Sequence, residues 1–312
     1  ALVEAGALVD KPDRGGLTAL AAAVEADAHD VVRYLLSVGA ESVCPEPELC
    51  TALRTASEPV IRELLDHGFE PDVAGSGGWT PLMIAAERGD EALVRLLLER
   101  GADPTRTLGE RFLDAVLIAV AAGREEAAWV LQAASVARLP APEVVWTRIG
   151  ERLPAGLAAN WKTGRRPPPI PDPWRTLDPH ARAQLTLLSP GRHLYAYRTL
   201  ALAEAVDIGL AARETEPGQL ALDPEEPLER VWFSPHWVPV AIDRDGRLLA
   251  VDVDPPAGGI HGQVLHWSPD FGPVGVVASS LGLLLLAYLR RLEAGVSLED
   301  LDRTNLETAF GT

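Results

Sequence analysis

The stretch that decides the fold runs from residue 78 to residue 104 and reads GWTPLMIAAERGDEALVRLLLERGADP. Thr80 is placed to cap a helix that begins at Pro81, because proline has a preset φ and no amide hydrogen to lose. Gly89 turns the chain, and Gly101 suits a left-handed cap after a second helix. The residues expected to be buried between neighbouring helices are Leu82, Ala85, Ala86, Leu93, Val94, Leu96 and Leu97.

The same plan recurs along the first half of the chain. Glycines at Gly6, Gly39, Gly68 and Gly101 are separated by 33, 29 and 33 residues, and Thr18, Thr51, Thr80 and Asp114 are separated by 33, 29 and 34. Both series shift at the same place. The second unit is therefore four residues short between Thr51 and Gly68, and we expect its first helix or the following turn to be trimmed.

This period and motif resemble the ankyrin-repeat family over residues 1 to about 135. The resemblance implies an all-α ankyrin solenoid with an N-terminal half-repeat and about four units. Because the chain opens inside the second helix of a repeat, we expect further repeats upstream in the natural protein, where they would cover an apolar end. The positions expected to face outward and contact a protein partner are Arg14, Trp79, Glu87 and Arg88.

The second half predicts an α+β domain with an antiparallel sheet. We expect a linker at residues 136–142, the domain at 143–296 and a C-terminal tail at 297–312. An amphipathic helix is predicted over 144–153, with Val145, Trp146, Ile149 and Leu153 on one face. The Asp-Gly pair at 245–246 lies between two apolar runs, which indicates a β-hairpin of strands 237–242 and 248–253. A third strand is expected over 262–267, and residues 271–289 favour a strand followed by a buried helix rather than a membrane span.

Several motifs of this half resemble the SUKH (Smi/Knr-type) family over about residues 228–296. They are Trp232, the run 237–241, the Asp-Gly turn, Val251 to Pro255, Gly258, Gly262 to Val264, and Val277 to Ser279 before a leucine-rich helix. Many members of that family are bacterial immunity proteins that neutralise toxins, often nucleases, and its fungal founders regulate cell-wall assembly. Trp232, Asp252 and Asp254 are the partner contacts that we expect here, and the alternative for the Trp232 ring is a place in the core, as expected for Trp237. The proline-rich run 167–173 is expected to be a surface loop rather than a polyproline docking segment.

The negative net charge of the chain indicates which kind of partner it can bind. The net charge is −17. Residues 1–135 hold 23 acids and 11 bases, a balance of −12, and the remainder holds 22 acids and 17 bases, a balance of −5. An acidic surface repels a phosphate backbone, so a basic protein partner fits better than nucleic acid. Residues 136–201 are locally basic, which keeps a nucleic-acid alternative open, although the bases are scattered and Arg165 and Arg166 stand in no motif.

The sequence lacks the strong signatures of catalysis and cofactor binding. It holds no glycine-rich phosphate loop with lysine, no HExxH, no G-x-S-x-G and no paired cysteine motif, so we expect no catalytic residue, no cofactor and no metal. A metal site could be drawn from Asp252, Asp254, His261 and His266, but turn capping is the commoner role of such residues. Cys44 and Cys50 fit reduced thiols in the cytoplasm, and no membrane segment or secretory signal is expected.

These observations predict a non-enzymatic, cytoplasmic protein-binding protein. The first hypothesis is an immunity-type inhibitor that neutralises a bacterial toxin or nuclease domain by direct contact. The alternative is an intracellular adaptor or regulatory scaffold that joins two cellular proteins. The third hypothesis is an enzyme that uses the aspartates and histidines of the C-terminal half. A toxin gene beside this gene would separate the first from the second, and metal-dependent turnover would support the third.

Overall fold

A computed structural model describes residues 8–40, 53–108, 112–154, 179, 193–195, 197–200, 202–214 and 228–303 of the chain. The chain forms two compact units, the first made of residues 1–109 and 118–135 and the second of residues 110–117 and 136–312. Segment 110–117, which the sequence assigned to the repeats, therefore belongs to the second unit. Cys44, Cys50, Arg165, Arg166 and the proline-rich run 167–173 lie outside the described residues.

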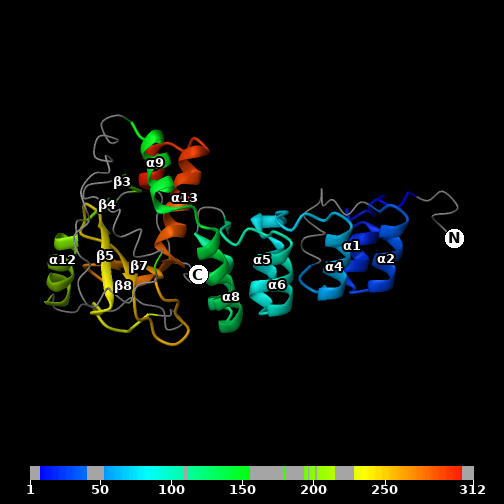
Figure 1. Cartoon of the computed structure of the whole chain (residues 1–312), viewed down its shortest axis with the longest axis horizontal. Helices are drawn as coiled ribbons and strands as arrows, with labels where there is room; N and C mark the ends of the chain where they lie inside the picture. The colour runs from blue at the N-terminus through cyan, green and yellow to red at the C-terminus, as the bar shows by residue number, and fades with distance from the viewer. Residues whose placement is uncertain are drawn as a thin grey trace. The chain divides into compact units, whose positions relative to one another are not determined.

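The first unit is built from short helices that pack in pairs. Its helices are α1 (Ala19–Glu25), α2 (His29–Ser37), α4 (Glu58–Asp66), α5 (Pro81–Arg88) and α6 (Glu91–Glu99), with a 3-10 turn η1 (Ser76–Gly78) and strand β1 (Thr107–Leu108). Figure 1 shows α1 beside α2 and α5 beside α6. A last pair, α7 (Ala115–Ala121) and α8 (Glu125–Arg138), contributes residues to both units.

The predicted helix caps are present. Thr80 Oγ1 accepts a hydrogen bond from the Met83 amide at 3.3 Å, and Thr18 Oγ1 accepts one from the Ala21 amide at 3.1 Å. These bonds satisfy amide groups that the first turn of a helix leaves without partners. Gly101 follows α6 with φ of 98°, which confirms its left-handed cap. All seven apolar residues predicted to be buried in this motif are buried: Leu82, Ala85, Ala86, Leu93, Val94, Leu96 and Leu97.

The shortened second unit keeps a full second helix. Helix α4 has nine residues, as do α2 and α6, and it begins after Ser57. The second helix of this unit is therefore not the shortened part, and the predicted trimming of the first helix or its turn stays a prediction. Thr51, the expected start of this unit, lies outside the described residues.

The second unit is centred on a six-stranded antiparallel sheet in the order β3-β4-β5-β6-β7-β8. The strands are β3 (His193–Leu194), β4 (Tyr197–Thr199), β5 (Trp237–Ile242), β6 (Leu248–Asp252), β7 (Val264–Ser268) and β8 (Gly272–Ala278), and a further strand, β2 (Leu113–Asp114), lies outside this sheet. The predicted hairpin is confirmed, with Trp237 opposite Asp252 and Ile242 opposite Leu248. Asp243 Oδ1 closes its turn by accepting hydrogen bonds from the amides of Asp245 and Arg247.

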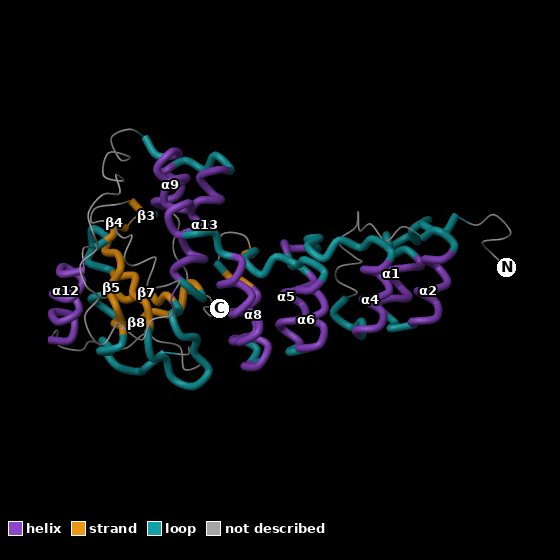
Figure 2. Tube along the Cα trace, in the orientation of Figure 1, coloured by secondary structure: helices purple, strands orange, loops and turns teal. Residues whose placement is uncertain are grey.

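Helices cover both faces of this sheet. Figure 2 shows α12 (Leu202–Glu214) on one side of the strands and α13 (Leu281–Glu293) on the other. Helix α12 contacts β5, and α13 packs against both β8 and α9 (Pro142–Arg152). The predicted buried face of α9 is confirmed, because its residues Val145, Trp146, Ile149 and Leu153 all belong to the core. Segment 271–289 is a strand followed by a buried helix, as predicted.

The C-terminal side of this unit differs from the predicted boundaries. Helix α14 (Leu298–Arg303) lies within the range expected to be a tail, and Leu301 is fully buried in the core. In the same way, α8 extends to Arg138 and α9 begins at Pro142, so helices occupy most of the predicted linker at 136–142. Leu301 is a single apolar residue between charged ones, and only its packing shows that it belongs to the domain.

Candidate protein-binding site

A glycine-rich turn positions Trp79 just before helix α5. Gly77 and Gly78 adopt φ of 70° and 83°, a left-handed conformation that favours glycine. The Gly75 amide donates to the Trp79 carbonyl at 2.8 Å, which closes the turn. Trp79 immediately precedes the capping Thr80 and is half-buried, so part of its ring stays accessible to a partner.

The Trp79 ring is part of a cluster that links neighbouring repeats. The Arg54 guanidinium carbon lies 4.7 Å from the centroid of the Trp79 ring. The same guanidinium donates to Glu87 Oε2, so one cation contacts an aromatic face and a carboxylate together. The side chains of Arg54 and Glu87 are each 42% exposed. The structure thus brings Trp79 and Glu87, both predicted contact residues, into one accessible cluster, and it adds Arg54, which the sequence analysis did not select.

Arg88, another predicted contact, has a structural role within the first unit. Its guanidinium donates to the backbone carbonyls of Leu53, at 3.1 Å, and of Ala56. It also lies 3.3 Å from Asp90 Oδ2. Leu53 and Ala56 are both buried, so these carbonyls depend on protein donors for hydrogen bonds. Arg88 therefore fixes the loop that carries Arg54, and little of its donor capacity is left for a partner.

Arg14 lies in the turn that precedes α1, two repeats away from Trp79. Asp13 Oδ1 shapes this turn by accepting hydrogen bonds from the amides of Gly15, at 2.7 Å, and Leu17, at 3.0 Å. Arg14 itself is exposed. It stays a predicted contact residue at a place separate from the cluster of Arg54, Trp79 and Glu87.

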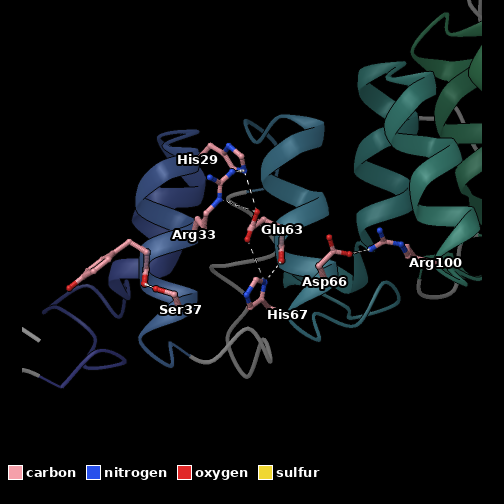
Figure 3. Close-up of polar contacts among 8 residues, drawn as sticks. His29, Arg33, Ser37, Glu63, Asp66, His67 and Arg100 are labelled. Carbon is pink, nitrogen blue, oxygen red and sulfur yellow. Dashed lines mark hydrogen bonds and ion pairs between the residues drawn. The ribbon is translucent and has the colours of Figure 1, made fainter.

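A second polar network joins helices α2 and α4 of the first unit, and Figure 3 shows Glu63 at its centre. Glu63 of α4 lies 3.4 Å from His29 Nε2 and 3.5 Å from Arg33 Nε, both of α2, and 3.8 Å from His67 Nδ1. The next link joins Asp66 to Arg100 at 2.8 Å. This network was not predicted from the sequence. Its only signal was the repeat period, which places side chains about one repeat apart on neighbouring helices.

The second unit holds the other three predicted contacts, and two of them are buried. Asp252 has no exposed surface and Trp232 is only 8% exposed, whereas the Asp254 side chain is 71% exposed. The Trp232 carbonyl accepts from the Trp267 indole at 2.7 Å. This burial corrects the expectation for Trp232 and Asp252, because side chains with so little exposed surface offer almost nothing for a partner to contact. Asp254 alone of the three stays accessible.

Asp252 organises the connection between β6 and β7. Its carboxylate accepts hydrogen bonds from the Asp254 amide, at 3.1 Å, and from Gln263 Nε2, at 3.3 Å. Gln263 Oε1 in turn accepts from the Ile260 amide at 3.0 Å. Burial raises the pKa of Asp252 to about 6, although both hydrogen bonds favour the charged form. This is the capping role that the sequence allowed for the aspartates.

Two further polar groups of the second unit, Asp114 and the partly buried His266, also have shifted pKa values. Asp114 accepts hydrogen bonds from the Leu117 amide, at 2.9 Å, and from the Ser279 hydroxyl, and burial raises its pKa to about 6. His266 Nε2 lies 3.1 Å from the Tyr197 hydroxyl, and burial lowers its pKa to about 4. Within the described residues no group of three or more His, Cys, Asp or Glu side chains could hold a metal ion. The metal site drawn from Asp252, Asp254, His261 and His266 is therefore not assembled.

The described part of the chain also contains no helix with both the length and the apolar character needed to cross a membrane.

Comparison with known proteins addresses the first unit. Residues 44–107 match the family model described as ankyrin repeats (3 copies). The chain is 32% identical over 111 residues to the ankyrin repeat and SAM domain-containing protein 6 of Danio rerio, covering 34% of this chain and 15% of that protein. It is 33% identical over 107 residues to an ankyrin repeat-containing protein of Treponema pallidum, covering 33% of this chain and 36% of that protein.

A shorter match is 48% identical over 52 residues, to the ankyrin repeat, SAM and basic leucine zipper domain-containing protein 1 of Oryctolagus cuniculus. It covers 17% of this chain and 11% of that protein, so the chain spans only a small part of the relatives that it matches. The helix pairs, their caps and these matches agree. Residues 44–107 of this chain carry ankyrin repeats, and such repeats suggest a role in protein–protein interaction.

Proposed function

We propose that this chain is a non-enzymatic immunity-type inhibitor, whose ankyrin repeats capture a basic bacterial toxin or nuclease domain and neutralise it by direct contact. The observation that carries the proposal is the accessible cluster of Trp79 and Glu87 on the repeats. Tryptophan is enriched among the residues that dominate binding energy at protein interfaces. A carboxylate beside it favours a partner with positive charge.

The distribution of charge supports a basic partner. Residues 1–135 carry a balance of −12, from 23 acids and 11 bases, and this range includes the repeats. Complementary charge accelerates encounter between two proteins and selects against partners of like charge. A nucleic acid would be repelled by the same surface.

Support for an immunity role comes from the resemblance of residues 228–296 to the SUKH family. One motif of this resemblance, the Asp-Gly turn, lies in the β5–β6 hairpin. Asp254, the exposed member of the predicted contacts, is the position in this unit where we place a secondary contact. The proposal places the protein in the cytoplasm, where Cys44 and Cys50 would stay reduced.

An adaptor that joins two cellular proteins is the second candidate. It is favoured by the division of the chain into two units, because each unit could bind a different protein. A toxin gene directly beside this gene would decide for the inhibitor.

Salt dependence tests the proposed mode of capture. After a pull-down with the full chain and identification of the partner by mass spectrometry, the association rate should fall about tenfold between low and high salt, because ions screen complementary charge. Glu87→Gln should lower the rate at low salt, whereas Asp254→Asn should change it less. A rate that is flat or rises with salt would contradict electrostatic capture. If the association rate loses its salt dependence only in Asp254→Asn, the binding surface lies on the second unit.

A further inference from the structure

We infer that Trp79 and Glu87 form a binding site for an arginine side chain of the partner, and that Arg54 occupies this site when the partner is absent. The inference rests on the proposed function and deepens it, because it assigns the chemical group that the site takes. The ligand is a guanidinium group on a basic protein surface. Arg54 is the internal competitor that the partner displaces.

The geometry around Arg54 shows what the site recognises. The guanidinium carbon lies 4.7 Å from the Trp79 ring centroid, within the range of a cation–π contact. The guanidinium also donates to Glu87 Oε2. A planar guanidinium can contact an aromatic face and hydrogen-bond a carboxylate at the same time, which a lysine ammonium does less well. The contacts of the Arg54 guanidinium are therefore the ones that we expect an arginine of the partner to make.

The site is placed so that its internal occupant can leave. The side chains of Arg54 and Glu87 are each 42% exposed, and Trp79 is half-buried. Ion pairs and cation–π contacts at exposed positions are weak, so neither holds Arg54 tightly. An arginine side chain is long and flexible, so it can swing into solvent while the backbone beneath it stays in place.

Arg88 keeps that backbone in place. It donates to the carbonyls of Leu53 and Ala56, which lie on either side of Arg54 in the sequence. Both residues are buried. The loop is therefore fixed independently of the Arg54 guanidinium, and displacement of Arg54 requires only a change of its side-chain rotamer. Arg88 is a positioning residue for this exchange.

Removal of the competitor should raise affinity, which separates this inference from a purely structural bridge. If Arg54 fills the site for most of the time, the apparent affinity for an external guanidinium is reduced by the fraction of sites that are free. Arg54→Ala frees every site. We expect an acetylated tetra-arginine peptide amide to bind the full-length Arg54→Ala chain about fivefold more tightly than the unmodified chain, measured by isothermal titration calorimetry.

The matched control is Arg62→Ala. Arg62 is an exposed arginine of α4 whose partner is Glu58 of the same helix, so this variant makes the same change in net charge without opening the site. Its affinity for the peptide should stay within about twofold of the unmodified chain, because only the general attraction changes. Adding Trp79→Ala or Glu87→Gln to Arg54→Ala should abolish the gain. A tetra-lysine peptide should bind Arg54→Ala more weakly than tetra-arginine.

Equal affinities of Arg54→Ala and Arg62→Ala for tetra-arginine would overturn the inference, and so would the absence of measurable binding by every variant. Equal affinity for the two peptides would overturn the assignment to arginine. These results would leave the proposed function standing, because that proposal is tested by the association rate with the captured partner. Circular dichroism of each variant verifies that the helices are intact.

Discussion

Replacing Arg88 with alanine is expected to lower the free energy of unfolding of the first unit by about 2 to 4 kcal/mol. The guanidinium donates to the carbonyls of two buried residues, Leu53 and Ala56, and lies beside Asp90. Without it, both carbonyls lose a charged donor in a place that water reaches poorly. A buried polar group without a partner carries a larger cost than the net value of the hydrogen bond itself.

The measurement is a urea titration of the full chain, with hydrogen exchange read on peptides from residues 53–100. The control is Arg95→Ala, because the Arg95 side chain is 58% exposed and pairs with Glu91 of the same helix. That variant should change stability by less than about 0.5 kcal/mol. If Arg88→Ala is as stable as Arg95→Ala, the structural role assigned to Arg88 is wrong.

Replacing Asp114 with asparagine is expected to stabilise the second unit at neutral pH, by about 1 to 3 kcal/mol. Burial raises the pKa of Asp114 to about 6 from 3.8. The folded state therefore keeps the proton up to about pH 6, whereas the unfolded chain loses it near pH 4. The contribution of this proton to stability is complete below pH 4 and is lost as the pH rises to 6.

Asparagine imitates the protonated carboxyl and has no charge to bury. Its oxygen can still accept from the Leu117 amide, and its nitrogen can donate to the Ser279 hydroxyl oxygen. The gain over the unmodified chain should be largest at pH 7.5 and should shrink as the pH falls to 4. Thermal unfolding across this range measures it.

The pH profile of the unmodified chain has other contributions that the variant keeps. Burial also raises the pKa of Asp252 to about 6, so the folded state loses the stabilising contribution of the Asp252 proton as the pH rises to 6. His266 acts in the opposite direction, because burial lowers its pKa to about 4 and the folded state then gains stability as the pH rises through 4 to 6.5. Subtracting the pH profile of the unmodified chain from that of Asp114→Asn cancels the contributions of Asp252 and His266. Asp245→Asn removes the same charge at an exposed turn position and is the control; it should change stability at pH 7.5 much less than Asp114→Asn does. A less stable Asp114→Asn at pH 7.5 would contradict the assignment.

Most of the fold of the first unit could be predicted from the sequence, because the helix starts, turns and caps of each repeat are determined by residues within that repeat. The Thr80-Pro81 start, the turn at Gly89 and the cap at Gly101 depend on residues within one repeat, and all three are present. The β5–β6 hairpin was readable for the same reason, since Asp243, Asp245 and Gly246 define the turn locally.

What the sequence could not provide are contacts that depend on how the chain packs. Arg88 was expected to face outward, but it reaches carbonyls of the preceding repeat, 32 and 35 residues away. The contact of Arg54 with Trp79 and Glu87 could not be predicted either, because it depends on the path of a loop between repeats. Asp252 ends strand β6, where an aspartate is often exposed, but the connection to β7 folds back over it and Gln263 hydrogen-bonds its buried carboxylate. For the binding site, Trp79 and Glu87 were selected correctly as accessible positions, and their contact with a partner stays a prediction.

The most direct test of the account is the affinity of the full chain for its captured partner after replacing Trp79 with alanine and Glu87 with glutamine together. The control replaces Tyr34 of α2 with alanine and Glu91 of α6 with glutamine, which removes one aromatic ring and one charge elsewhere in the same unit. Tyr34 is 46% exposed. We predict that the first pair weakens affinity at least about tenfold, because aromatic anchors dominate protein interfaces, and that the control stays within about twofold. Equal affinities of the two variants would contradict binding through the Trp79 and Glu87 site.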